Sequence, residues 1–99
     1  MPSLRARAIR WIDTDQCPYI LEAEFTDADG VRRLLVDKDV VFGGPELSLA
    51  TIFPIEILAG CELLTRAGDR VRITVDRPYG IGTPDDNPEF EVYPDQLLD

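Results

Sequence analysis

Residues 19–26 alternate between apolar and polar side chains, and this pattern restricts how the chain can fold. Tyr19, Leu21, Ala23 and Phe25 share one face, and Glu22, Glu24 and Thr26 share the other. Successive side chains of a strand point to opposite faces of its sheet, so the pattern predicts a strand with one buried and one solvated face. Residues 31–37 follow as its hairpin partner, with Leu34 and Val36 on one face and Gly30 at a turn position that favours positive φ.

The remaining chain divides into short strands separated by turn-forming residues. Further strands are expected over residues 4–13, 40–42, 61–66, 70–76 and 90–93, with 61–66 and 70–76 paired as a second hairpin. Residues 45–54 should form one helical turn or a packed loop, residues 77–88 a loop and residues 94–98 a closing helical turn. The sequence therefore predicts one mainly β domain over residues 1–99: a small antiparallel sheet or half-closed barrel of five to six strands with at most short helical turns.

Length and composition fit one hydrophobic core without a targeting segment. The chain has 99 residues, of which 44% are hydrophobic. A chain of this size buries roughly 60–65% of its unfolded surface on folding. No apolar run approaches the ~20 residues that span a bilayer, and the first residues lead into charged alternation instead of an apolar signal stretch. We therefore expect a cytoplasmic protein.

The chain is strongly acidic, and its charge is unevenly distributed. The formal net charge is −9, of which residues 1–40 carry −2 and residues 41–99 carry −7. Nucleic-acid binding depends on Lys and Arg neutralising phosphates, so this composition argues against a nucleic-acid partner. An anionic membrane surface is disfavoured for the same reason. A basic protein partner fits the charge because complementary potentials accelerate encounter, and ordinary solubility explains the charge equally well.

The residue types that usually carry catalysis are missing or badly placed. Histidine is absent, which removes the commonest general base and the usual serine and cysteine triads. Paired aspartates recur, but none continues into the ligand series of a calcium loop, and residues 80–82 lack the Lys-Ser/Thr of a phosphate loop. Lys38 lies between Asp37 and Asp39, which favour its charged, non-nucleophilic form. We therefore expect no catalytic residue, no metal site and no cofactor.

The two cysteines, Cys17 and Cys61, are far apart in sequence and form no CxxC motif. This spacing excludes a zinc site built from cysteines. In a reducing cytosol we expect two thiols, at least one of them buried. A disulfide would require Cα atoms within ~7 Å, which the sequence leaves open.

The candidate partner-binding residues all lie in the loop over residues 77–88. Tyr79 and Arg77 are the strongest candidates, because exposed loop aromatics contact partners and because Tyr and Arg are favoured interface anchors. Asp85 and Asp86 of the same loop are the other two candidates, and the cluster at 85–88 is interpreted as solvated turn residues in preference to a cation site. The alternative is structural: Tyr79 folds back to cap the barrel while Arg77 pairs with an aspartate.

Several short motifs occur in order along the chain. They are Val-Asp-Lys at 36–38, Val-Phe at 41–42, Arg-Pro-Tyr-Gly-Ile at 77–81, Phe-Glu-Val at 90–92 and Gln-Leu at 96–97. Together they resemble a widespread set of small bacterial proteins of unassigned function, which share a VDK–VF, RP-x-G-I and FEV–QL pattern. The resemblance covers about residues 8–98 and implies a compact bacterial cytosolic domain. It carries over no activity, and the stretch 82–87 of this chain departs from the more polar stretch of that set.

Three functional hypotheses follow, in order of preference. The first is a non-enzymatic interaction module that docks a basic protein partner, for which a toxin-neutralising immunity-type protein is one concrete case. The second is a small-molecule or ion binder that uses the mouth of the sheet and the 77–88 loop. The third is an unusual carboxylate-driven enzyme, which would need a pocket holding two carboxylates within ~10 Å of each other.

Overall fold

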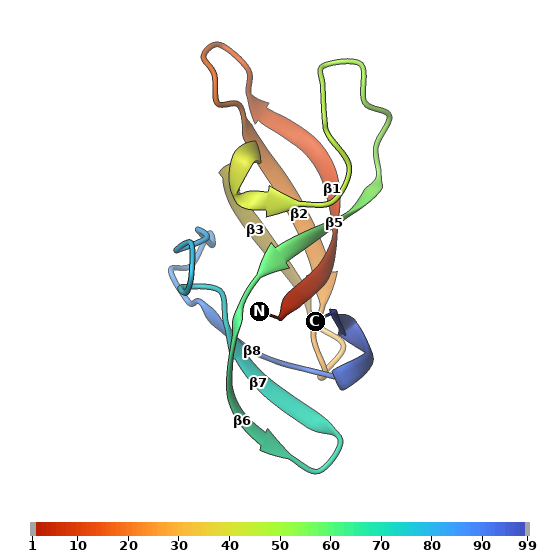
Figure 1. Ribbon diagram of the computed structural model, residues 1–99, viewed down its shortest axis with the longest axis vertical. Helices are drawn as coiled ribbons and strands as arrows, with labels where there is room; N and C mark the ends of the chain where they lie inside the picture. Colours follow the sequence, from red (N-terminus) through yellow and green to blue (C-terminus); the bar gives the residue numbers. More distant parts are fainter. Residues whose placement is uncertain (1, 99) are drawn as a thin grey trace.

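The computed structural model describes residues 2–98, which form nine strands and two 3-10 turns (Figure 1). The strands are β1 (Ser3–Asp13), β2 (Ile20–Thr26), β3 (Arg32–Lys38), β4 (Phe42–Gly43), β5 (Ile55–Gly60), β6 (Glu62–Ala67), β7 (Arg70–Thr74), β8 (Glu89–Val92) and β9 (Leu97–Leu98). The turns are η1 (Asp39–Val41) and η2 (Pro94–Gln96). No helix among residues 2–98 is long and apolar enough to cross a membrane.

The strands divide between two antiparallel sheets. The larger sheet has the order β3-β2-β1-β5-β4, with β9 also paired to β1, and the smaller has the order β6-β7-β8. Only Cys61 separates β5 from β6, so the chain passes directly from one sheet into the other, and the molecule is elongated, at 43 × 24 × 22 Å (Figure 1). The predicted mainly β class with only short helical turns is confirmed. The division into two sheets was not predicted, and residues 2–98 form no closed barrel.

The hairpin of β2 and β3 has the predicted pairing but a different buried face on its second strand. Leu21 and Ala23 of β2 are fully buried, as the alternation predicts. On β3 the buried residue is Leu35, which pairs with Ala23, whereas Leu34 pairs with the outward-facing Glu24. Residues 34–36 of β3 are all apolar, so the sequence alone did not show which face of this strand points inward. The cross-strand register resolves it, because paired residues lie on the same face.

One continuous core joins the two sheets. Val71 and Ile73 of β7 and Phe90 of β8 are buried together with side chains of the larger sheet. Phe90 meets Phe25 of β2 edge to face, with ring centroids 5.1 Å apart and planes at 84°. Aromatic pairs favour this geometry because the positive ring edge meets the negative ring face. The smaller sheet is therefore a wall of the same core and not a separate unit.

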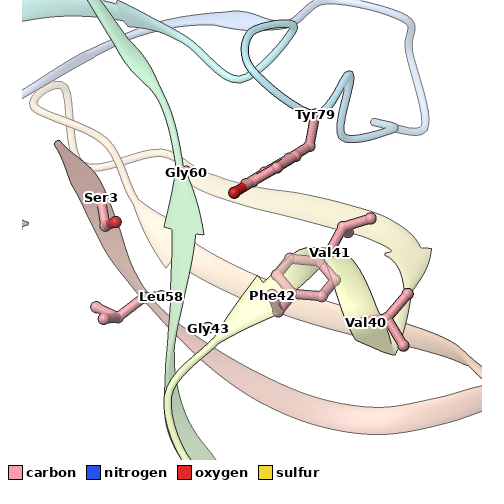
Figure 2. A pocket seen from close by; sticks show the side chains of 8 residues that line it. All are labelled: Ser3, Val40, Val41, Phe42, Gly43, Leu58, Gly60 and Tyr79. Carbon is pink, nitrogen blue, oxygen red and sulfur yellow. The ribbon is translucent and has the colours of Figure 1, made fainter. Parts of the chain in front are cut away.

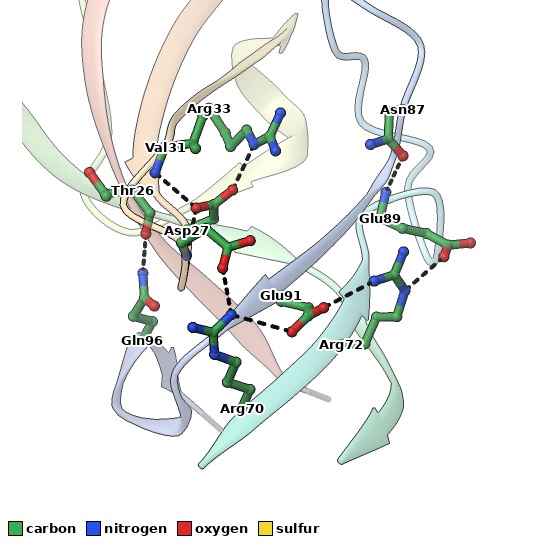
Figure 3. A network of polar contacts seen from close by, with 11 residues as sticks. Thr26, Asp27, Val31, Arg33, Arg70, Arg72, Asn87, Glu89, Glu91 and Gln96 are labelled. Atoms are coloured by element: carbon green, nitrogen blue, oxygen red, sulfur yellow. Dashed lines mark hydrogen bonds and ion pairs between the residues drawn. The ribbon is translucent and has the colours of Figure 1, made fainter. Parts of the chain in front are cut away.

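The β2–β3 turn, residues 27–31, is built around one buried carboxylate (Figure 3). The Asp27 side chain is 4% exposed. It accepts hydrogen bonds from Arg33 Nε at 2.8 Å and from the backbone N–H groups of Asp29 and Val31, both at 2.9 Å. Gly30 closes the turn at φ +79°, in agreement with the sequence prediction. The carboxylate therefore stabilises the turn and also binds the side chain of Arg33 at the start of β3.

Polar contacts from this turn also fasten the two sheets together (Figure 3). Asp29 pairs with Arg70 of β7 at 2.6 Å, and Arg70 lies 3.7 Å from Glu91 of β8. The Ala28 N–H donates to the Glu91 carbonyl at 2.9 Å, and Tyr93 Oη donates to the Ala28 carbonyl at 3.2 Å. The turn therefore joins the two sheets through polar contacts, in addition to the aromatic contact between Phe25 and Phe90.

The cysteines lie in contrasting environments, and neither forms a disulfide. Cys61 is fully buried, and its burial raises the pKa of its thiol to about 11. Cys17 is exposed in the β1–β2 loop. Because the thiolate is the reactive form, we expect one thiol to react quickly with Ellman's reagent in the native protein at mildly alkaline pH, and two after denaturation. Rapid reaction of both thiols in the native protein would contradict the assigned burial, and Cys17→Ser should remove the fast phase.

Candidate partner-docking surface

An apolar cavity of about 310 Å³ lies between the η1–β4 segment and the loop that carries Tyr79 (Figure 2). Its walls are formed chiefly by Val40, Val41, Phe42, Leu58, Gly60 and Tyr79. We call this cavity the Tyr79 notch. Tyr79 is 55% exposed and Val40 is 72% exposed, so the two side chains flank the notch without being covered. The notch is therefore an apolar surface open to a binding partner.

Gly60 provides the surface against which Tyr79 lies. The glycine is buried at the end of β5, and a Cβ at this position would lie 3.0 Å from Cε2 of Tyr79. The absence of a side chain thus lets the ring rest directly on the strand, while Tyr79 stays 55% exposed. The neighbouring Arg77 pairs through Nε with Glu62 at 2.8 Å. The structural alternative is met only in part, because the ring contacts the strand but stays exposed, and Arg77 pairs with a glutamate.

Val40 was not a candidate from the sequence, where residues 40–42 read as a strand. The structure instead has a 3-10 turn at Asp39–Val41, after which Phe42 begins β4. The Asp39 N–H donates to the Tyr19 carbonyl at 2.9 Å, and the Phe42 N–H donates to the Asp39 carbonyl. This turn directs Val40 into solvent while Phe42 faces the notch (Figure 2). Three consecutive apolar residues, 40–42, gave no indication of which one would lie outside the core.

A second cavity, of about 320 Å³, adjoins the notch and shares Val40, Phe42 and Gly43 with it. Its lining adds Asp39 and Glu46, and the Oδ1 atom of Asp39 is buried without a hydrogen-bond partner among the described residues. Neither carboxylate forms an ion pair with any residue in the described part of the chain. Uncompensated negative charge therefore borders the apolar notch.

The loop that carries Tyr79 is fastened to the edge of β3. The Val36 N–H donates to the Gly82 carbonyl at 2.9 Å, and the Gly82 N–H donates to Asp37 Oδ2 at 2.9 Å. A Cβ at Gly82 would lie 2.7 Å from the Val36 carbonyl oxygen, so only glycine fits here. These bonds cover part of the β3 edge and hold the loop against the sheet.

Asp85 and Asp86 have local roles in the same loop. Asp85 accepts hydrogen bonds from Thr83 Oγ1 at 3.3 Å and from the Asn87 N–H at 3.2 Å, and it lines a different cavity, of about 200 Å³. Asp86 adopts φ +60°, and its N–H donates to the Thr83 carbonyl at 3.2 Å. The structure therefore places Tyr79 in the notch, Arg77 beside it in an ion pair, and the two aspartates in a separate turn.

A larger cavity, of about 460 Å³, lies beside β1 and η2, but its charges largely compensate one another. Arg7 pairs with Glu24 at 3.2 Å, and Arg5 approaches Glu56 at 3.7 Å. Over residues 2–98, no three His, Cys, Asp or Glu side chains are grouped so that they could hold a metal ion. Within the described residues, the Tyr79 notch combines exposed apolar side chains with the unpaired carboxylates of the adjoining cavity.

Comparison of the chain with protein-family models, with curated proteins and with solved structures found no match.

Proposed function

We propose that this protein is a non-enzymatic interaction domain that docks a basic protein partner at the Tyr79 notch. A single observation carries the proposal: exposed Val40 and Tyr79 flank an apolar notch that is bordered by the unpaired carboxylates of Asp39 and Glu46. The resemblance to small bacterial proteins supports a role in the bacterial cytoplasm. An immunity-type protein that covers the basic active site of a toxin is one concrete case of such a module.

The surface has the composition expected of a binding site. Interfaces gain most of their energy from a few central aromatic or apolar anchors, and Tyr is prominent among these. Tyr79 is held from one side by Gly60 and fastened through its loop to β3, so little side-chain entropy is lost on binding. The neighbouring carboxylates and the net charge of −9 would speed encounter with a basic partner and make association sensitive to salt.

Substitutions at the notch should weaken binding without unfolding the protein. Tyr79→Ser removes the anchor, and we expect affinity for the partner to fall by about 2 kcal/mol, which is roughly thirtyfold. Val40→Ser should cause a smaller loss of affinity, because valine is a smaller anchor than tyrosine. It should not unfold the protein, because the Val40 side chain is 72% exposed. The measurement is recovery of the partner from bacterial lysate on the immobilised protein, followed by calorimetry with the purified partner.

Val31→Ser is the matched control, because Val31 is also exposed, at 45%, but lies in the β2–β3 turn. It should bind as the unmodified protein does. Failure of the unmodified protein to retain any protein at physiological salt would overturn the proposal. Equal loss on Val31→Ser and Val40→Ser would also overturn it.

A small-molecule ligand for the notch is the second candidate function. Its volume of about 310 Å³ lies at the lower end of the range for ligand pockets, and its lining is mainly apolar. A metabolite or cation that binds the folded state should raise the melting temperature in a thermal-shift screen, and Tyr79→Ser should abolish the increase. A broad screen without any stabilising compound would exclude this second function.

A further inference from the structure

The cavity of about 320 Å³ beside the Tyr79 notch, which we call the Asp39 cavity, combines apolar walls with an uncompensated carboxylate. Its apolar lining consists of Val40, Phe42, Pro45, Leu47 and Ile57. Asp39 Oδ1 is buried without a hydrogen-bond partner among the described residues, and Asp39 forms no ion pair with any of them, its sequence neighbour Lys38 included. A buried polar atom without a partner costs free energy, and the cost is largest for a charged group. The folded chain therefore retains an acceptor that a donor from outside the chain can satisfy.

The backbone holds Asp39 in place while its carboxylate keeps some freedom to turn. The Asp39 N–H donates to the Tyr19 carbonyl at 2.9 Å, and the Asp39 carbonyl accepts from the Phe42 N–H. The outer torsion of an aspartate side chain has a broad energy minimum, so the carboxylate can turn toward a donor in the cavity without a change in the backbone. Glu46, an exposed residue that also forms no ion pair, adds negative charge at the same cavity.

We propose that the partner of the Tyr79 notch places one lysine or arginine side chain in the Asp39 cavity. The apolar walls cover the methylene groups of that side chain, and its charged end pairs with Asp39 and Glu46. Because the two cavities share part of their lining, the partner presents this basic side chain next to the apolar side chain that fills the notch. This inference rests on the proposed function and adds to it the chemistry that the partner must display.

Peptides selected from a display library of short random sequences are the probe. The folded protein is immobilised, and peptides that bind the unmodified protein but not Tyr79→Ser are retained as notch-dependent peptides. We expect these peptides to share an apolar residue with a lysine or arginine close to it in sequence. The same selection on Asp39→Asn should lose the preference for a basic residue.

A double-mutant cycle between the protein and one notch-dependent peptide tests the contact itself. Asp39→Asn should weaken binding at least about tenfold, and so should replacing the basic residue of the peptide by an uncharged residue of similar length. The two changes together should weaken binding little more than either change alone, because they remove the same contact. Calorimetry measures the four affinities.

The two carboxylates should differ in their kinetic effects. Asp39→Asn removes one member of a largely covered pair and should mainly raise the dissociation rate of the peptide, whereas Glu46→Gln changes an exposed charge and should mainly lower the association rate and its salt dependence. Asp39→Asn should not lower the melting temperature, because Asp39 has no ion pair within the described part of the free chain. A purely structural role for Asp39 would instead lower the melting temperature and leave the two rates unchanged.

Asp69→Asn is the matched control, because it removes the same charge at an exposed position in the β6–β7 turn and should leave peptide binding unchanged. The inference is overturned if notch-dependent peptides show no enrichment of basic residues, or if the two changes of the cycle have additive effects. In both cases the proposed function stands, because binding still depends on Tyr79. A selection without any notch-dependent peptide also overturns the inference, and the lysate experiment then decides the proposed function.

Discussion

Asp27→Asn should lower the free energy of unfolding by about 3 kcal/mol at neutral pH. The Asp27 carboxylate is almost completely buried and satisfies three donors, namely Arg33 Nε and the N–H groups of Asp29 and Val31. Hydrogen bonds to a charged group contribute about 1.5–3 kcal/mol, and removing one partner of a buried ion pair leaves the other uncompensated. Because Arg33 is 34% exposed, water screens part of this loss.

The loss should depend on pH in a defined direction. Burial by itself would raise the pKa of Asp27, but the hydrogen bonds from Arg33, Val31 and Asp29 outweigh it, and the pKa lies below its ordinary value. A lowered carboxyl pKa contributes stability above the unfolded-state pKa of about 3.9, and the contribution is lost as the pH falls through the folded-state value. The stabilities of Asp27→Asn and the unmodified protein should therefore converge in acid.

Urea denaturation at neutral pH and at a series of acidic pH values measures this difference. The Arg32 hydrogen bond to Glu24 also lowers the pKa of that carboxyl, but this effect is common to both proteins and cancels. Asp29→Asn is the control within the same turn. Its side chain is 61% exposed, so loss of its ion pair with Arg70 should cost less than about 1 kcal/mol. A deficit for Asp27→Asn that is small, or that stays constant with pH, would contradict the assigned role.

Gly82→Ala should destabilise the protein by about 2–3 kcal/mol. The added Cβ would lie 2.7 Å from the Val36 carbonyl oxygen, and that atom belongs to a strand backbone that cannot move aside freely. Relief requires the loop to leave β3, which breaks the bonds of Gly82 with Val36 and Asp37. Overpacking of this kind costs about 1–3 kcal/mol, to which the weakened hydrogen bonds add.

The measurement for Gly82→Ala is again the free energy of unfolding, together with hydrogen exchange of the Val36 amide, which should become faster. Gly43→Ala is the control, because a Cβ there meets Leu58 Cβ at an ordinary 3.5 Å. It should change stability by less than about 1 kcal/mol. Equal stabilities of the Gly82 and Gly43 variants would show that the loop adapts without strain.

Binding at the Tyr79 notch should weaken in Gly82→Ala, since the same loop carries Tyr79.

Local chemistry accounts for the parts of the fold that were predicted correctly. The alternation in β2 assigned Leu21 and Ala23 to the core, and Gly30 marked the turn that follows. Strand side chains face alternate sides whatever the strand pairs with, and glycine tolerates positive φ in any context. These properties belong to single residues and their nearest neighbours, so one sequence suffices to detect them.

The candidate site, in contrast, depends on contacts between residues that are distant in the sequence. Tyr79 could be proposed as a contact because of its residue type and loop, but its support by Gly60 involves two positions far apart in sequence. From the sequence Val40 was expected in a strand, but the 3-10 turn before β4 and the pairing of β4 with β5 direct it into solvent. No local pattern distinguishes an apolar side chain that will be covered from one that the neighbouring strand leaves uncovered.

For this protein, therefore, the β class, the two hairpins and the acidic surface follow from residues read in order, because steric preference and charge act at short range. The break into two sheets at Cys61, the inward face of β3, the Tyr79 notch and the cavity beside it depend on which distant strands pair and in what register. Register is selected by the packing of the whole core, so these features exist only once the chain has folded.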